Sequence, residues 1–200
     1  MEKLAVMPVL LYRYLRYGYT FRRIRLTQGK YAIVDPDDYF RLNGYKWNAH
    51  RDYNTSYARR KFTRKDGKRR NCSMHREVIK VPDNMFVDHI NRNGLDNRKA
   101  NLRPATVSQN ARNCAKSRRR TFCSRFKGVT WHRGKKLWQT KIVLNQKHIY
   151  IGSFKDELQA AKAYDKAAKK YHGEFAVLNL PETKPSIYRR IITLVRAFIF

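Results

Sequence analysis

The chain has 200 residues, and its 45 Lys and Arg against 15 Asp and Glu give a formal net charge of +30. The hydrophobic share of 42% is enough for packed cores and argues against wholesale disorder. Such a positive field calls for a polyanionic partner, and nucleic acid is the commonest one because each phosphate contact releases condensed counterions. An anionic membrane is a weaker alternative, because the charge is spread along the whole chain.

The two ends of the chain are predicted to lie outside the folded modules. Residues 1–23 form an N-terminal extension whose short apolar stretch is interrupted by Pro8, with no cleavage-site pattern behind it. Residues 182–200 form a C-terminal tail that is too short and too charged to span a bilayer. The three cysteines contain no CxxC pair, which argues against a disulfide framework or a Cys-rich zinc site. We therefore expect a cytoplasmic protein of a bacterial cell, a phage-infected host cell or an organelle, not a secreted one.

Residues 24–114 alternate strand-like runs with turn residues. The runs cover residues 31–34, 57–62 and 72–74, and the Asp66–Gly67 pair marks a hairpin between the second and the third. A short helix is predicted over residues 35–45, with Asp35 as its N-cap and Pro36 in its first turn. Residues 115–125 (AKSRRRTFCSR) then form a basic linker. It can act as a solvated tether, or it can follow DNA phosphates through Arg118, Arg119 and Arg120.

The region after the linker predicts a three-stranded sheet with one helix. The strands cover residues 126–131, 137–143 and 147–151, and the helix covers residues 156–172. One helical stripe is apolar and should cover the sheet: Leu158, Ala161, Tyr164, Ala168 and Tyr171. Strand alternation places six apolar side chains toward that helix: Val129, Trp131, Trp138, Ile142, Ile149 and Ile151.

The opposite face of this sheet is polar. It presents Thr130, His132, Gln139, Lys141, His148 and Tyr150, with Arg133, Lys135 and Lys136 at its edge. Such a face is either an ordinary solvated surface or a nucleic-acid surface. The net charge of +30 favours the second interpretation.

Residues 126–181 resemble the plant ethylene-response-factor (APETALA-two) DNA-binding domain through their KGV, KKLWQTKI, YIGSF, AAKAYDKAA and AVLNLP elements. The resemblance implies a three-stranded antiparallel sheet in the DNA major groove, backed by the helix. It places DNA contacts at Lys127, Thr130, His132, Lys141, His148 and Tyr150. Several arginines and a tryptophan of the family are replaced here, so its target sequence does not carry over.

Residues 74–113 resemble an HNH nuclease of the phage and intron homing type through MHREVIK, VDHINRNGLDNRKANLR and TVSQNARN. Phosphodiester hydrolysis needs a base that activates water and a divalent metal such as Mg²⁺ or Mn²⁺. His89 is the candidate base, and Asp88 offers a carboxylate to the metal. The resemblance implies that Asn101 tethers the loop beside the catalytic strand and that Asn110, on a helix capped by Thr106, completes the metal site.

Other residues of this region have two interpretations. His75 either supports the site or is a packed structural histidine. Asn91, Gly94 and Asn97 are interpreted as turn residues that tolerate a left-handed backbone. Without a zinc knuckle, we expect apolar packing to brace the module through Phe86, Val87, Ile90 and Leu102. The segment RIRLTQGKYAIVDPDDYFRLNGYKW also resembles the leader of proteins that join these two modules.

The sequence thus predicts an α+β protein with a ββα-metal HNH module and an ethylene-response-factor-type sheet and helix. We expect a metal-dependent endonuclease of the homing type that binds double-stranded DNA and acts as a monomer or weak dimer without an obligate protein partner. A non-catalytic DNA-binding regulator with a structural HNH remnant is the main alternative. The presence of Asp88, His89 and Asn110 argues against it. An RNA-binding protein is a third hypothesis, because the charge alone suits any polyanion.

Overall fold

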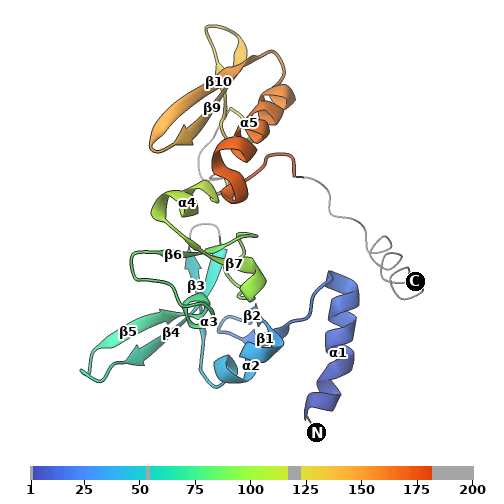
Figure 1. Cartoon of the computed structure of the whole chain (residues 1–200), viewed down its shortest axis with the longest axis vertical. Helices are drawn as coiled ribbons and strands as arrows, with labels where there is room; N and C mark the ends of the chain where they lie inside the picture. The colour runs from blue at the N-terminus through green and yellow to red at the C-terminus, as the bar shows by residue number, and fades with distance from the viewer. Residues whose placement is uncertain (1, 53–54, 117–122, 182–200) are drawn as a thin grey trace. The chain divides into compact units, whose positions relative to one another are not determined.

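The computed structural model describes residues 2–52, 55–116 and 123–181, and of residues 2–5 only the backbone. It confirms the α+β class, with helices and small antiparallel sheets (Figure 1). Contacts within the described part divide it into two compact units. The first consists of residues 1–80 and 93–103, and the second of residues 81–92 and 104–182. The domain boundaries expected at residues 24, 115 and 126 stay predictions.

The first unit begins with α1 (Glu2–Tyr17), followed by the antiparallel pair β1 (Arg22–Arg25) and β2 (Tyr31–Val34) and by α2 (Pro36–Asn43). Both β2 and α2 lie where the sequence predicts them. Asp35 is the N-cap residue of α2, but its carboxylate does not bond to the helix itself. Its Oδ2 instead accepts a hydrogen bond of 2.7 Å from the Lys99 amide, and so joins the 93–103 loop to the start of α2.

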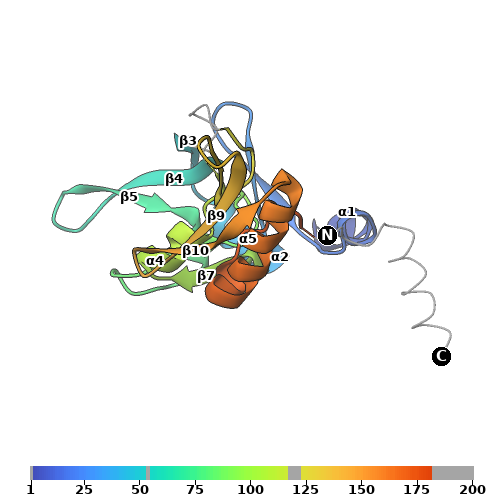
Figure 2. The ribbon, with the colours of Figure 1, turned by 90° about the horizontal axis from the view of Figure 1, so that it is seen from above.

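A three-stranded antiparallel sheet follows in the order β3 (Asn48–Asp52), β4 (Thr55–Thr63) and β5 (Arg69–Ser73). The predicted hairpin turn lies between β4 and β5, with Gly67 at a φ of 74°. In Figures 1 and 2, this hairpin extends away from the rest of its unit. The short helix α3 (Met74–Val78) comes next, so the strand expected over residues 72–74 ends one residue early and the fully buried Met74 opens a helix.

The core of the first unit is a cluster of buried apolar side chains from β1 to α3: Ile24, Leu26, Ala32, Val34, Leu42, Trp47, Ala49, Ala58 and Met74. Trp47 is the largest of them, and its indole Nε1 donates a hydrogen bond of 2.8 Å to the Leu42 carbonyl at the end of α2. Complete burial of a large apolar side chain contributes roughly 1.5–3 kcal/mol. This cluster therefore fixes α2 and α3 against the sheet.

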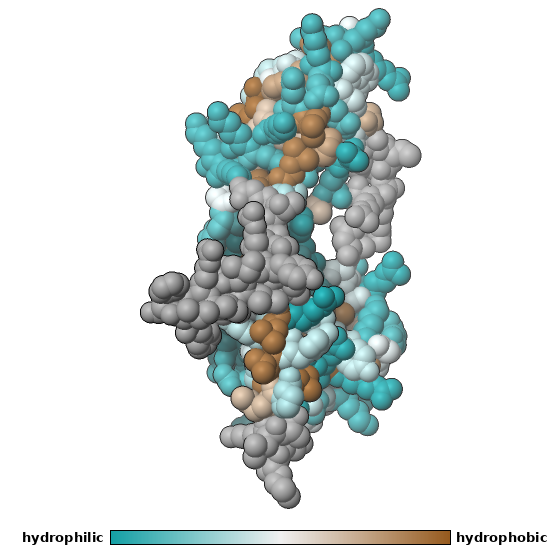
Figure 3. Space-filling model, turned by 90° about the vertical axis from the view of Figure 1, so that its right-hand side faces the viewer, coloured by the Kyte–Doolittle hydropathy of each residue, from teal (hydrophilic) through white to brown (hydrophobic). Residues whose placement is uncertain are grey.

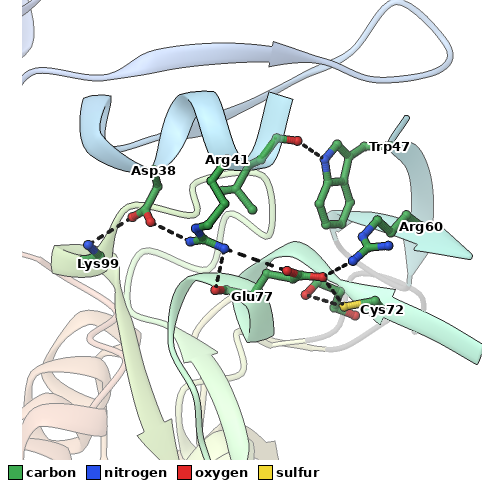
Figure 4. Close-up of polar contacts among 9 residues, drawn as sticks. Asp38, Arg41, Trp47, Arg60, Cys72, Glu77 and Lys99 are labelled. Carbon is green, nitrogen blue, oxygen red and sulfur yellow. Dashed lines mark hydrogen bonds and ion pairs between the residues drawn. The ribbon is translucent and has the colours of Figure 1, made fainter. Parts of the chain in front are cut away.

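A network of ion pairs around Glu77 reinforces this packing (Figure 4). Glu77 of α3 accepts a hydrogen bond of 2.5 Å from Arg60 of β4 and one of 3.1 Å from the Cys72 thiol. Arg41 of α2 donates to the Glu77 carbonyl and pairs with Asp38 at 2.6 Å. Burial, together with the hydrogen bond to Glu77, raises the pKa of Cys72 to about 11. Cys114 and Cys123 are exposed free thiols.

The helix α1 carries apolar side chains that face solvent. Met7, Leu11 and Tyr12 are each about 60% exposed, at 63%, 59% and 61%. The side view in Figure 3 shows a hydrophobic patch where α1 lies. Among the residues that the structure describes, no helix has the length and apolar character needed to cross a membrane.

The second unit contains β6 (Phe86–His89), α4 (Val107–Arg112) and the C-terminal sheet. β6 pairs with β7 (Leu102–Ala105), whose last two residues belong to the same unit. The C-terminal sheet has the order β10-β9-β8, all antiparallel, with bounds β8 (Val129–His132), β9 (Leu137–Leu144) and β10 (Lys147–Phe154). It is followed by α5 (Glu157–His172), whose N-cap Asp156 accepts a hydrogen bond of 2.8 Å from the Gln159 amide. The predicted sheet and helix are confirmed.

The buried face of α5 differs in detail from the predicted stripe. Ala160, Ala161, Tyr164, Ala167 and Ala168 are buried, whereas Leu158 is 41% exposed, so its predicted place in the stripe is wrong. Small alanines let the helix lie close to the sheet, and the Leu158 side chain lies outside that contact. Val129 and Ile142 of the sheet are buried as predicted. Trp131 is 37% exposed and contacts Trp138 edge-on, with ring centroids 5.0 Å apart.

Candidate nuclease site

The candidate catalytic pair lies at the end of β6. Asp88 and His89 are 4% and 5% exposed, so two adjacent polar residues are held inside the protein. Buried polar groups need hydrogen-bond partners, and partners of this kind fix side chains in place. The chain turns directly after them: the Arg92 amide donates to the His89 carbonyl at 2.8 Å, and Arg92 has a left-handed backbone with a φ of 62°.

The helix α4 is fixed at its start by a capping box. The Thr106 side chain accepts a hydrogen bond of 3.2 Å from the Gln109 amide, and the Gln109 side chain accepts one of 2.8 Å from the Thr106 amide. This confirms the predicted cap at Thr106. A helix of only six residues is marginal by itself, so the cap and the contacts at its other end determine where its side chains lie.

Those contacts come from Asn113, the C-cap residue of α4. Its Nδ2 donates one hydrogen bond of 2.7 Å to Asp88 Oδ1 and another of 2.9 Å to the His89 carbonyl. Asn113 is 5% exposed and therefore belongs to the buried site. Asn113 was not among the site residues predicted from the sequence. Its spacing could have indicated it, because Asn113 is three positions after Asn110 and lies next to it on one helical face.

Asn110, the predicted metal ligand, is half-buried on α4. Its amide donates to the Thr106 carbonyl at 2.9 Å, and its own carbonyl accepts from the Cys114 thiol. No hydrogen bond of its side chain occurs among the described residues. An amide oxygen and a carboxylate are hard donors of the kind that Mg²⁺ accepts when substrate phosphates and water complete its shell. The donor set of Asp88 and Asn110 therefore fits one Mg²⁺ or Mn²⁺ ion.

A metal centre can also be built from three or more His, Cys, Asp or Glu side chains. In the described ranges 2–52, 55–116 and 123–181, no three His, Cys, Asp or Glu side chains gather in a way that could hold a metal. A site of one carboxylate and one amide does not need such a cluster, because Mg²⁺ is commonly held by one or two carboxylates in phosphate-processing enzymes.

Asn101 and His75 lie in the first unit. The Asn101 side chain donates to the Asp96 carbonyl at 2.8 Å, and so ties the 93–103 loop to itself. Asp96 in turn holds Arg98 with two hydrogen bonds of 2.8 and 2.7 Å. The His75 ring lies edge-on to Tyr57, with centroids 5.8 Å apart. The catalytic role of Asn101 and the supporting role of His75 stay predictions.

Two expectations about this region are wrong. Phe86 and Ile90 are 45% and 44% exposed, so only Val87 and Leu102 of the four predicted bracing residues are buried. Phe86 is the first residue of β6 and Ile90 follows its last residue, so both lie at the ends of the buried stretch formed by residues 87–89. Gly94 does not have a left-handed backbone. A side chain there would meet the Ser56 carbonyl and the Tyr57 ring at 2.6 Å, so close packing explains this glycine.

The polar face of the C-terminal sheet is open. Thr130, Lys141, His148 and Tyr150 are exposed, as are Arg133 and Lys135 of the turn, whereas His132 is half-buried. Lys141 pairs with Tyr150 across the strands, so a cation and an aromatic ring lie next to each other. The predicted contacts at Arg118, Arg119 and Arg120 lie outside the described residues.

Lys127 differs from the other predicted DNA contacts. Its ammonium group donates to the Arg112 carbonyl at 2.7 Å and to the Cys114 carbonyl at 2.6 Å, at the end of α4. Burial lowers the pKa of Lys127 to about 8. Cations stabilise the carbonyl end of a helix, so Lys127 holds α4 against the C-terminal sheet. The predicted contact between Lys127 and DNA stays a prediction. The ammonium group that would make it already donates hydrogen bonds to two backbone carbonyls.

Residues 80–112, which include Asp88, His89 and Asn110, match the family model described as HNH endonuclease. A protein of Acanthamoeba polyphaga mimivirus, named as an uncharacterized HNH endonuclease, is 31% identical over 159 residues, which are 76% of each chain. The chain belongs to the HNH endonuclease family. In this family member, the matched segment covers all of β6, β7 and α4, the elements that hold the candidate site.

This HNH endonuclease also resembles plant transcription factors over a shorter stretch. APETALA2-like protein 2 of rice (Oryza sativa subsp. japonica) is 43% identical over 58 residues, 28% of this chain. The AP2-like ethylene-responsive transcription factor ANT of Arabidopsis thaliana is 40% identical over 66 residues, 32% of this chain. The chain spans 13% and 12% of the lengths of these two relatives. The family assignment and the partial similarity confirm both resemblances predicted from the sequence.

Proposed function

We propose that this HNH endonuclease is a metal-dependent enzyme of the homing type that hydrolyses phosphodiester bonds in double-stranded DNA. One observation carries the proposal. Asp88 and His89 are buried side by side on β6, and a single residue of α4, Asn113, bonds to the carboxylate of one and the carbonyl of the other. Burying two adjacent polar groups costs free energy that packing alone does not require, and buried polar groups held by hydrogen bonds are frequent at functional sites.

In the proposed reaction, His89 accepts a proton from the water that attacks the phosphorus atom. The hydrogen bond from Asn113 to the His89 carbonyl fixes the backbone, so the imidazole has little freedom to leave its position. Asp88 and Asn110 would hold one divalent metal ion, which supplies charge stabilisation to the phosphoryl oxygens and the departing 3′ oxygen. The Asn113 amide orients the Asp88 carboxylate by taking up Oδ1. A single site of this kind cuts one strand, so a monomer nicks duplex DNA.

The C-terminal sheet is proposed to select the site of cleavage. Its open face combines a cation, an aromatic ring and hydrogen-bonding side chains, the types that contact phosphates and base edges. Within the second unit, Lys127 joins this sheet to the end of α4, the helix that carries Asn110. The proposed DNA-binding sheet and the helix that carries Asn110 are therefore joined directly by the hydrogen bonds of Lys127.

The test is a nicking assay on supercoiled plasmid in Mg²⁺ or Mn²⁺ and in EDTA, with His89→Ala as the inactive variant. We expect metal-dependent nicks that the variant loses by at least 100-fold, with DNA affinity within about twofold of wild type, because a general base contributes to the transition state and little to substrate binding. Equal loss of cleavage and binding would contradict the role of His89. Footprinted binding without any cleavage by the wild type would favour a DNA-binding regulator.

A further inference from the structure

The hairpin of β4 and β5, with its connecting turn, is the most charged segment of the described chain. We call residues 59–71 the basic ribbon. It contains eight cations and one acidic residue: Arg59, Arg60, Lys61, Arg64, Lys65, Lys68, Arg69 and Arg70 against Asp66. Every residue from 61 to 71 is exposed to solvent. So much like charge on a narrow hairpin repels itself, and no predicted DNA contact included it.

One face of the basic ribbon is fixed to the protein. Arg60, opposite Cys72, bonds to Glu77 at 2.5 Å and lies 4.0 Å from the centre of the Tyr45 ring. Its guanidinium is also 5.6 Å from the centre of the Phe62 ring on the same face. These contacts hold the base of the hairpin against the core around Trp47. The hairpin therefore leaves the protein in a defined direction.

The other face of the basic ribbon is open. Strand alternation places Arg59, Lys61, Arg69 and Asn71 on it, since Lys61 pairs with Asn71 and residues two apart share a face. The neighbouring strand β3 adds Asn48 and His50, and these side chains border a shallow cavity of about 470 Å³. Cations, amides and an imidazole therefore share one concave surface, with the donor groups that bind phosphates and base edges.

Ordinary explanations account for only part of this charge. Lysines on an exposed strand edge help to prevent edge-to-edge aggregation, which explains the presence of some of these cations. Of the eight cations, only Arg60 forms an ion pair within the described ranges. Lys61, Arg64, Lys65, Lys68, Arg69 and Arg70 thus keep their charges available.

The dimensions of the basic ribbon match the DNA major groove. A groove about 12 Å wide and about 8.5 Å deep admits a two-stranded β-ribbon. The paired rows run from Arg59 opposite Ser73 to Thr63 opposite Arg69. At about 3.4 Å per residue these rows extend roughly 14 Å, and the turn adds to that length. The hairpin is long enough to enter the groove while its base stays outside.

We propose that the basic ribbon is a second DNA-docking element, separate from the C-terminal sheet, and that it inserts into the major groove of duplex DNA. The proposal rests on the proposed function in that duplex DNA is the substrate. It adds a DNA contact made by the first unit to the one proposed for the C-terminal sheet of the second unit.

The test compares two variants that lose the same charge. The ribbon variant is Lys61→Gln/Lys65→Gln/Arg69→Gln, and the control is Lys155→Gln/Lys162→Gln/Lys166→Gln, at exposed positions just before and within α5. Affinity for a duplex carrying the cleavage site is measured from about 50 to 200 mM salt. Each lost phosphate contact lowers the slope of log K against log salt by about 0.9, so the ribbon variant should lose roughly 2–3 units of slope and at least tenfold in affinity. The control should keep the wild-type slope.

Dimethyl sulfate footprinting shows which groove is occupied, because it methylates guanine N7 in the major groove. We expect the ribbon variant to lose one block of protected guanines and to keep the block that belongs to the C-terminal sheet. Equal slopes for ribbon variant and control would overturn the proposal, and so would a loss of affinity for structured RNA with DNA binding unchanged. A turn variant, Lys65→Gln/Lys68→Gln, gives the same readout if the triple variant unfolds.

Failure of this proposal can be told apart from failure of the proposed function. A wild-type enzyme that nicks plasmid DNA, with a ribbon variant that binds and protects the same guanines, refutes the basic ribbon alone. A wild-type protein that neither nicks nor prefers duplex DNA refutes both.

Discussion

Substitutions of Asn113 and Asn110, at the end of α4 and within it, should distinguish a contribution to the stability of the nuclease site from a contribution to its chemistry. Asn113→Ala removes the hydrogen bonds to Asp88 Oδ1 and to the His89 carbonyl, of 2.7 and 2.9 Å. A hydrogen bond to a charged group contributes about 1.5–3 kcal/mol and a neutral one about 0.5–1.5 kcal/mol. Their sum predicts a destabilisation of about 2–4.5 kcal/mol, because both acceptors are buried and water cannot easily replace the lost donor.

Asn110→Ala is the matched control on the same helix. The Asn110 side chain is half-buried and has no hydrogen bond among the described residues, so its removal should change the free energy of unfolding by less than about 0.5 kcal/mol. If Asn110 is a metal ligand, the same variant should nick DNA at least 100-fold more slowly at low Mg²⁺. Part of that activity should return at higher Mg²⁺, because the missing ligand weakens metal affinity.

The measurements are urea denaturation followed by circular dichroism, and plasmid nicking across a series of Mg²⁺ concentrations. Asn113→Ala should lower the unfolding midpoint, whereas Asn110→Ala should lower only the nicking rate. Equal stability of the two variants would refute the structural role of Asn113. Wild-type nicking by Asn110→Ala at every Mg²⁺ concentration would refute the metal role of Asn110.

Three further variants test other contacts. Gly128→Ala should destabilise the C-terminal sheet by about 2–4 kcal/mol, because φ is 74° there and a Cβ would lie 2.1 Å from the Tyr164 ring. Urea denaturation measures this loss, and an unfolding midpoint equal to that of the wild type would contradict the close packing at Gly128. Burial lowers the pKa of Lys127 in the folded protein to about 8, below its ordinary value of 10.5, so the unfolded chain binds this proton more tightly. The free energy of unfolding should therefore rise as the pH increases from 8 toward 10.5. Lys127→Met should lose that part of the pH dependence, and an unchanged profile would show that the ammonium is not buried. Thr106→Ala should cost about 0.5–2 kcal/mol by removing the cap of α4, and the rescue variant Thr106→Ser should restore it.

The C-terminal half of the fold could be predicted closely from the sequence, because its periodicity is strong. Alternating strands and a capped amphipathic helix each leave a signal within a few residues, and Asp156 and Gly173 mark the ends of α5. The bulge in β10 could not be predicted. The register shifts between Tyr150 and Gly152, so Gly152 and not Ile151 lies opposite Thr140. An extra residue of this kind depends on the partner strand, which local patterns do not contain.

The sequence predicts candidate reactive residues for the site, but it did not predict the residues that hold them in place. Asp88 and His89 follow from a motif with fixed spacing, because chemistry restricts the residue types that can serve. Asn113 and Lys127 act through tertiary contacts that form only after α4 lies against β6 and the C-terminal sheet. The resemblance to the ethylene-response-factor domain placed Lys127 among the predicted DNA contacts. The structure shows that a lysine can also cap a helix from another element.

The positions of the three thiols make this protein suited to fluorescence measurements without engineered cysteines. Cys114 and Cys123 are exposed and bracket most of the basic segment 115–125, whereas Cys72 has a pKa of about 11. The raised pKa of Cys72 leaves far less thiolate near neutral pH than an ordinary cysteine has, and the thiolate is the form that reacts with maleimide dyes. A donor and acceptor pair should therefore label the two ends of this segment and leave the core unlabelled. Energy transfer between them would report the distance between the two labelled positions with and without duplex DNA.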